Sequence, residues 1–275
     1  MPMSQESGAA PTPACAGRAG LGGTLELRVR REQYIADVSF PDPCVILVTR
    51  GHKTLSAGDQ QLGAGPGELL FINAGVTAAM RNRPDADGVY AATCVAMAPD
   101  LVRAHAAARN AVPGSPWRAL SHAPAQSTLA DVVRHAAAGM LGGPTVSDRL
   151  IRHRLEELLI ALDDLGCWCR ISTAATAAER VRGLLAGEPA ANWTAAAVAQ
   201  RLHMSEASLR RALRGEATGF RAVLDDVRMS TGLALIQGSA MSLQQIAGEC
   251  GYASPSRFAA RFRQRFGVTP SSLRR

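Results

Sequence analysis

Two clusters of arginine near the C-terminus are the residues of this sequence best suited to chemistry. Arg210, Arg211 and Arg214 form the first cluster, and four more arginines lie within residues 257–265. A guanidinium group is permanently charged and pairs with phosphate or with the two acceptors of guanine in the major groove. The clusters therefore predict contact with a nucleic acid; the alternative is a pair of arginine-rich helix faces in solvent.

The net charge of the chain is concentrated around these clusters. Residues 175–275 contain 14 arginines and 7 acidic residues, whereas residues 1–174 contain 16 residues of each sign. The whole excess of +7 thus lies in the C-terminal part. This distribution favours a polyanionic partner for that part of the chain.

A pattern that occurs twice positions the arginines. Its apolar positions are Val198, Leu202, Met204, Leu209 and Leu213 in the first copy, and Ile246, Cys250, Tyr252, Phe258 and Phe262 in the second. Each copy predicts a short helix with a narrow apolar face, a tight turn, and a second helix whose apolar residues are spaced by four. The turn falls at His203 and at Gly251, and a left-handed conformation there costs glycine less than it costs a side chain. Each copy therefore predicts a helix-turn-helix.

The two copies resemble the DNA-binding part of the AraC/XylS family of transcriptional regulators. In that family one long helix joins two helix-turn-helix units, and here residues 220–236 form an apolar segment between the copies. The matching residues of the second unit are Ser242, Leu243, Ile246, Ala247, Gly251, Tyr252, Ser254, Phe258, Phe262, Phe266, Gly267 and Pro270. The chain departs from the family at His203, at Ala207, where relatives often carry a larger side chain, and at Leu273, where an aromatic residue is usual.

The resemblance implies which side chains contact double-stranded DNA. Base-reading positions fall on Ala207, Arg210 and Arg211 in the first unit and on Pro255, Ser256 and Ala260 in the second. The full expected set is Thr194, Ser205, Ala207, Ser208, Arg210, Arg211, Arg214, Ser242, Ser254, Ser256, Arg257, Ala260, Arg261 and Arg265. We expect the first unit to discriminate sequence, the second mainly to hold the backbone, and the two to enter successive major grooves roughly 34 Å apart.

The N-terminal part follows another pattern, of short segments rich in β-forming residues between glycine-containing turns. These segments are residues 25–31, 45–49, 69–72 and 89–95, and such close spacing predicts a small antiparallel barrel. Residues 65–75 resemble part of the cupin barrel that many AraC-type regulators carry. The expected fold is α+β with two domains. A flexible tail spans 1–24, a cupin-like β-barrel with a helical dimerisation section spans 25–171, and an all-α double helix-turn-helix domain spans 172–275.

The barrel raises the alternative of a metal-dependent cupin enzyme fused to a DNA-binding domain. Metal-dependent cupins place two close histidines and a glutamate in one motif and a further histidine in the next. This stretch offers His52 alone, with Thr77 near the later position. We therefore expect no catalytic residue, metal or cofactor. A small effector could bind in or beside the barrel; Arg50, His52, Lys53, Arg81 and Arg83 could meet an acidic one, although exposed loop charges are the favoured interpretation.

A helix beginning near Ser147 or Asp148 carries a broad apolar stripe. The stripe is Ile151, Leu155, Leu158, Leu159 and Leu162, flanked by charged residues. It can cover the barrel, or, as the resemblance implies, pair two subunits. We favour a homodimer, to which these five residues contribute the interface.

The remaining expectations concern location, cysteines and partners. The sequence has neither an apolar run of membrane-spanning length nor the start of a signal peptide, so a cytoplasmic protein is expected. Six scattered cysteines predict neither disulfides nor a metal cluster. The expected partners are DNA, RNA polymerase, a second copy and a small-molecule effector. Regulation by activation is favoured because the resembling family consists mostly of activators. Two further classes of protein stay open: a DNA-repair regulator with a reactive cysteine, and a nonspecific nucleic-acid packaging protein.

Overall fold

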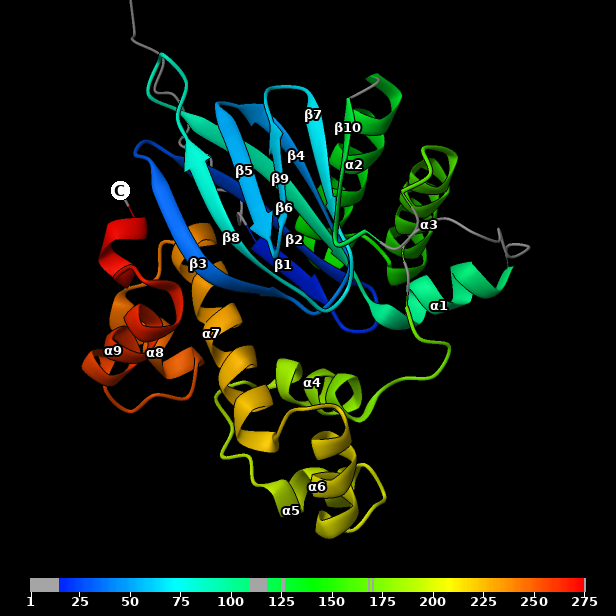
Figure 1. Ribbon diagram of the computed structural model, residues 1–275, viewed down its shortest axis with the longest axis vertical. Helices are drawn as coiled ribbons and strands as arrows, with labels where there is room; N and C mark the ends of the chain where they lie inside the picture. The colour runs from blue at the N-terminus through cyan, green and yellow to red at the C-terminus, as the bar shows by residue number, and fades with distance from the viewer. Residues whose placement is uncertain (1–14, 109–117, 125–126, 168, 170, 275) are drawn as a thin grey trace, which may run out of the picture.

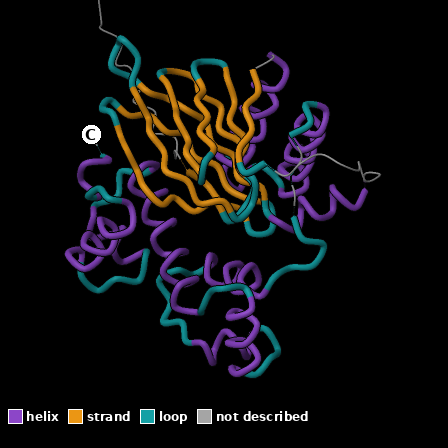
Figure 2. Tube along the Cα trace, viewed as in Figure 1, coloured by secondary structure: helices purple, strands orange, loops and turns teal. Residues whose placement is uncertain are grey.

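The N-terminal half of the chain forms antiparallel sheets and the C-terminal half forms helices, which confirms the predicted fold class (Figure 1). A computed structural model describes residues 15–108, 118–124, 127–167, 169 and 171–274. Figure 2 shows the strands gathered on one side of the molecule and the helices around and below them.

In the described part of the chain, ten strands make two facing sheets, which we call the barrel. The strands are β1 (Cys15–Arg18), β2 (Gly22–Val29), β3 (Gln33–Phe40), β4 (Cys44–Arg50), β5 (His52–Ala57), β6 (Gln60–Ala64), β7 (Glu68–Ile72), β8 (Val76–Arg83), β9 (Tyr90–Met97) and β10 (Leu120–Pro124). The larger sheet has the order β1-β2-β9-β4-β7-β10 and the smaller the order β3-β8-β5-β6. Neighbouring strands in both sheets run antiparallel.

A group of helices follows or covers the larger sheet. They are α1 (Pro99–Ala108), α2 (Ser127–Leu141), the 3-10 helix η1 (Gly143–Thr145) and α3 (Asp148–Asp164). The strand β4 is apolar at successive positions because Ile46 faces the barrel interior while Val45 and Leu47 pack against α2 and α3. Burial on both faces thus explains why β4 lacks the alternation of a half-exposed strand.

The apolar stripe of α3 lies inside the protomer, which contradicts its assignment to a dimer interface. Ile151, Leu155, Leu158, Leu159 and Leu162 are at most 2% exposed and belong to the cluster between α2, α3 and the larger sheet. Covering that sheet removes the apolar stripe from water, so a second subunit is not needed for its burial. The helix begins as predicted, with the Ser147 side chain accepting the Leu150 N–H.

The helical domain contains two similar helix pairs joined by a long helix. The elements are α4 (Ala177–Gly187), α5 (Ala195–Arg201), α6 (Glu206–Gly215), α7 (Phe220–Gly238), α8 (Leu243–Glu249), α9 (Pro255–Phe266) and η2 (Pro270–Leu273). We call α5 and α6 unit one, and α8 and α9 unit two. The domain boundary predicted near residue 172 falls in the connection between α3 and α4.

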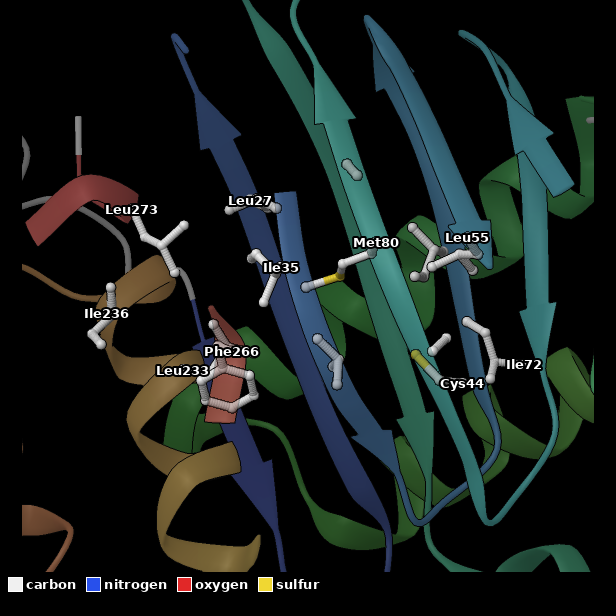
Figure 3. Packing of buried hydrophobic residues seen from close by; sticks show 14 of the residues in the cluster. Leu27, Ile35, Cys44, Leu55, Ile72, Met80, Leu233, Ile236, Phe266 and Leu273 are labelled. Carbon is white, nitrogen blue, oxygen red and sulfur yellow. The ribbon is translucent and has the colours of Figure 1, made fainter. Parts of the chain in front are cut away.

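The two units belong to different apolar cores. Unit one packs with α4 and the first half of α7, whereas unit two, the second half of α7 and η2 share one cluster with the barrel. Figure 3 shows Leu233, Ile236, Phe266 and Leu273 beside Leu27 and Ile35 of the barrel. The close contact favours glycine at position 238, because a Cβ there would lie 2.9 Å from the Cβ of Cys15 and 2.6 Å from Cδ1 of Leu25. Unit two is therefore docked on the barrel and unit one is not part of that core.

The predicted tail over residues 1–24 is wrong for its last ten residues. Cys15–Arg18 pairs with Gly22–Val29, and Leu21 is 1% exposed. Edge pairing with β2 and burial of Leu21 outweigh the low strand propensity of the glycines. Residues 1–14 lie outside the described residues. The sequence pattern also missed β3, β5, β6, β8 and β10, most of which alternate between apolar and polar residues.

Candidate nucleic-acid interface

The turns of the two units have the same construction. In unit one the Met204 N–H donates to the Ala199 carbonyl over 3.0 Å, and in unit two Tyr252 N–H donates to Ala247 over 2.8 Å. The residue before each donor is left-handed, with φ of 55° at His203 and 72° at Gly251. A side chain in this region costs about 1–2 kcal/mol, so unit one tolerates the strain that sequence reasoning predicted for His203.

Hydroxyl groups cap three of the four short helices. Thr194, Ser205 and Ser242 accept N–H groups of their own first turns, and Ser242 also forms a capping box with Gln245. Ser254 occupies the N-cap position of α9 without a side-chain capping bond. Each cap fixes the start of a helix and leaves its first N–H groups directed outward, the geometry that a phosphate oxygen requires.

Unit one exposes most of the side chains predicted to contact DNA. Ala207, Arg210, Arg211 and Arg214 are exposed on α6, and Ser208 is half-buried. Arg210 forms an ion pair with Glu206 one turn earlier. An exposed pair of this kind contributes less than about 1 kcal/mol, so the guanidinium can exchange the carboxylate for a base or a phosphate.

Unit two differs from the prediction at two arginines. Ser256, Arg257 and Ala260 are exposed on α9. Arg261, however, pairs through two nitrogens with Asp225 of α7, at 2.8 and 2.5 Å. Arg265 likewise pairs with Asp226 over 2.9 Å. Helical periodicity identified the polar face of α9 correctly but gave no information on the acids of the neighbouring helix.

Further charged side chains connect α7 with α4, and α4 with the N-terminal domain. Asp226 also pairs with Arg182 of α4 at 2.5 Å. Glu179 of α4 accepts a hydrogen bond from Arg103 of α1 over 3.0 Å, and both side chains are largely buried. Asp42, between β3 and β4, approaches this group, and burial raises its pKa from 3.8 to about 6. These five residues form an ionic contact between the barrel, α4 and α7.

A groove of about 550 Å³ lies between β2 and the end of the helical domain. Its basic side chains are Arg28 and Arg30 on one wall and Arg274 on the other. The Nε2 group of Gln237, also in the lining, is buried without a hydrogen-bond partner. Three arginines and an unpartnered N–H donor make the groove suited to an acidic ligand. Sequence reasoning missed it because its walls come from segments over 200 residues apart.

Lys53 was one of the charged residues considered for contact with an acidic effector, and it does not lie in an exposed loop as predicted. Its side chain points into the barrel and is 2% exposed, which contradicts the interpretation as an exposed loop charge. Arg50 pairs with Asp85 and Asp87, and Arg81 pairs with Glu32 at the surface. Alternation along β5 could have identified Lys53, because it shares the inward face with Leu55 and Ala57.

Neither metal nor thiol chemistry finds support in the part of the chain that the structure describes. No group of three or more His, Cys, Asp or Glu side chains in that part could hold a metal ion. His52 pairs with Arg83 of β8, and Thr77 lies six residues away on the same strand. His52 and Thr77 are therefore roughly 20 Å apart, too far to share a metal ion. Burial raises the pKa of the Cys44, Cys94 and Cys167 thiols, and of Cys250 to about 12, which disfavours reactive thiolates. Among the helices described, none is long and apolar enough to span a membrane.

Comparison with known families identifies both halves of the chain. Residues 28–166 match the AraC-like ligand binding domain, and residues 198–275 match a helix-turn-helix domain. The first match covers half of the chain. The chain belongs to the AraC family.

Curated relatives of this AraC-family protein match it over little more than a third of its length. Transcriptional regulator SirC of Salmonella typhimurium (strain SL1344) is 36% identical over 100 residues, which are 36% of this chain and 34% of SirC. The HTH-type transcriptional activator FapR of Escherichia coli is 35% identical over 102 residues, 37% of this chain and 39% of FapR. The matched part thus spans a little over a third of the length of these relatives.

Solved structures of ToxT from Vibrio cholerae resemble most of the AraC-family chain. The apo form of a single-residue variant of ToxT from Vibrio cholerae strain SCE256 gives a TM-score of 0.65 at 14% identity and covers 94% of this chain and 97% of its own. Wild-type ToxT of the same strain bound to an unsaturated fatty acid gives 0.61 at 15% identity, covering 90% and 93%. At this identity the likeness establishes the fold of both domains.

Proposed function

We propose that this AraC-family protein is a sequence-specific DNA-binding transcription regulator that activates genes by binding two successive major grooves. The observation that carries the proposal is the pair of helix-turn-helix units on the single helix α7, each with arginines on its second helix. The relative FapR bears the name of a transcriptional activator, which supports the sign of regulation. RNA polymerase is then the protein that the bound regulator contacts.

Unit one supplies most of the sequence discrimination in this proposal. Arg210 and Arg211 are exposed and long enough to pair with guanine, where a good bidentate contact discriminates by about 1–3 kcal/mol. Unit two presents Ser256 and Ala260 to the bases and Arg257 to the backbone. Arg261 and Arg265 reach DNA only after they leave Asp225 and Asp226, so their participation requires a change from this conformation.

The groove between β2, α7 and η2 is the proposed effector site. Its three arginines favour an acidic small molecule, and ToxT has been solved with a fatty acid bound. A ligand there touches both domains, so it binds the docked arrangement more tightly than an undocked one. Its differential affinity for the two arrangements is what controls DNA binding.

A homodimer remains part of the proposal, through a different face of α3. The outer face of that helix exposes Leu150 and Ile160, which are 43% and 54% exposed. Two such helices packed face to face would bury these side chains without disturbing the inner stripe. Sedimentation velocity of Ile160→Glu tests this interface: the variant is expected to be monomeric and as stable as the wild type.

Selection of genomic fragments by the full chain at about 0.15 M salt tests the main proposal. We expect a two-box motif with boxes one helical turn, roughly 34 Å, apart. The double variant Arg210→Ala and Arg211→Ala is expected to lose the motif, and Arg152→Ala, an exposed arginine of α3, serves as the matched control. The double variant Asp225→Asn and Asp226→Asn is selected in parallel because it releases the arginines of α9. If the affinity of every variant depends on salt concentration but not on DNA sequence, the protein is instead a nonspecific packaging protein.

A further inference from the structure

A row of buried polar groups crosses the smaller sheet and ends on the helical domain. The Lys53 ammonium donates to Asn82 Oδ1 over 2.7 Å, and Asn82 Nδ2 donates to Gln33 Oε1 over 3.3 Å. Gln33 Nε2 then donates to the main-chain carbonyl of Leu273 in η2 over 2.9 Å. We call this row the polar ladder. It connects the barrel interior with the last element of the helical domain.

The strand register places the ladder residues side by side. Asn82 on β8 lies directly opposite Gln33 on β3 and opposite Lys53 on β5. All three side chains are at most 3% exposed. Leaving a buried amide donor or acceptor without a partner destabilises the folded protein, so the hydrogen bonds of the ladder support one another.

The ends of the ladder fix the orientation of both amides. An ammonium group only donates hydrogen bonds, and a main-chain carbonyl only accepts them. Asn82 must therefore turn its oxygen to Lys53 and its nitrogen to Gln33, and Gln33 must turn its nitrogen to Leu273. In the opposite orientation Gln33 Oε1 would face the Leu273 carbonyl, two acceptors with no proton between them.

Lys53 is an unusual group to place at the inner end. It is the single lysine of the chain, and among the described residues no carboxylate forms an ion pair with it. The other contacts of its ammonium are Met80 Sδ at 3.4 Å and the ring of Tyr90, whose hydroxyl is itself buried without a partner. A buried uncompensated charge is costly, so packing does not explain it.

We propose that the polar ladder couples the barrel interior to η2, and that the hydrogen bond from Lys53 to Asn82 stabilises the docking of η2 on the barrel. A group that withdraws the ammonium from Asn82, of which a carboxylate is the best suited, removes the constraint on both amides. The orientation in which Gln33 donates to Leu273 is then no longer fixed, so that hydrogen bond is weakened although nothing has touched η2. This inference rests on the proposed effector control: a ligand in the groove favours the docked arrangement, whereas a carboxylate at Lys53 would release η2, so the two act on the same contact in opposite directions.

Hydrogen exchange of the full chain without DNA tests the ladder. Asn82→Asp is the deciding variant, because an isosteric carboxylate pairs with Lys53 and accepts from Gln33 Nε2 as well. Gln33 must then turn its oxygen to Leu273, so exchange in residues 268–274 is expected to rise about fivefold, the factor of one net hydrogen bond. Exchange in β4 should be unchanged. Gln33→Met should give the same rise, and combining the two substitutions should add nothing.

Asn73→Asp provides the matched control. Asn73 is 3% exposed in the same barrel and donates to the Arg118 carbonyl, away from the helical domain. It should leave residues 268–274 protected. The proposal is overturned if Asn82→Asp leaves that segment at the wild-type rate while Gln33→Met accelerates it, because Gln33 would then be a local anchor only. If Asn82→Asp lowers protection in β4 too, Lys53→Met becomes the deciding variant, with the same expected rise. Since no DNA is present, a failure of the proposed regulatory function would not alter these results.

Discussion

The ionic contact between the domains should make stability depend on pH through Asp42. Burial is the largest cause of its raised pKa; Arg182 lowers the value and Glu179 raises it by smaller amounts. A rise from 3.8 to about 6 corresponds to about 3 kcal/mol. Because the folded-state pKa is the higher one, this stabilisation is fully present below pH 3.8 and is lost as the pH rises through about 6. At neutral pH the ionised carboxylate therefore opposes the fold.

Replacing Asp42 by asparagine removes the ionisation and keeps the size of the side chain. The free energy of unfolding of Asp42→Asn is expected to exceed that of the wild type by up to about 3 kcal/mol at pH 7.5. The difference should shrink towards zero near pH 4. Urea unfolding of the full chain, followed by tryptophan fluorescence at steps between pH 4 and pH 8, measures it. Asp59→Asn, at an exposed aspartate in the β5–β6 turn, should stay within about 0.5 kcal/mol throughout.

The opposite sign would refute this reasoning. If Asp42→Asn is less stable than the wild type at pH 7.5, the attraction between Asp42 and Arg182 outweighs the cost of burial, and the contact is an ion pair that acid weakens. A difference that does not change with pH would show that the amide acts through packing alone.

Three further predictions concern the barrel lysine and the two units. Burial lowers the Lys53 pKa from 10.5 to about 8, so the free energy of unfolding of the wild type should rise by about 3 kcal/mol between pH 8 and pH 10.5. Thermal unfolding of Lys53→Met should show no such rise, and a rise equal to that of the wild type would contradict the prediction. In competition between duplexes, Arg210→Ala should reduce discrimination at one base pair by about 1–3 kcal/mol. Arg257→Ala should instead weaken binding to all duplexes alike, and should reduce the slope of log affinity against log salt concentration by about one. Asp225→Asn should release Arg261 and raise affinity for unrelated duplex; unchanged affinity and salt slope would mean that Arg261 does not reach DNA.

The helix-turn-helix units could be predicted because their signals are local. Apolar residues three and four apart, a turn at Gly251, and hydroxyl caps all lie within about 20 residues of each other, and helical periodicity relates them directly. The same holds for the start of α3 at Ser147. Unit one was predicted in as much detail, because its turn at His203 follows the same pattern.

The remaining features depend on contacts between segments distant in sequence. The apolar stripe of α3 predicted that this face of the helix is buried. A stripe buried against a sheet, however, has the same sequence pattern as one buried against a second subunit. Arg261 faces the polar side of its helix, and whether Asp225 or a phosphate meets it is decided by the packing of α7 against α9. The groove and the polar ladder join β-strands to η2 and have no local signature.

The division of the apolar cores also bears on how such proteins can be recombined. A chimaera that joins this N-terminal half to the DNA-binding part of another regulator at residue 172 would separate Leu27 and Ile35 from Phe266 and Leu233. The foreign part would have to offer apolar side chains of the same shape, or the barrel would expose an open side to water. Exchanging unit one together with α4 and the first half of α7 would leave the contacts with the barrel intact, because that core is separate. Altered DNA specificity is therefore more readily transplanted into unit one than by exchanging whole domains.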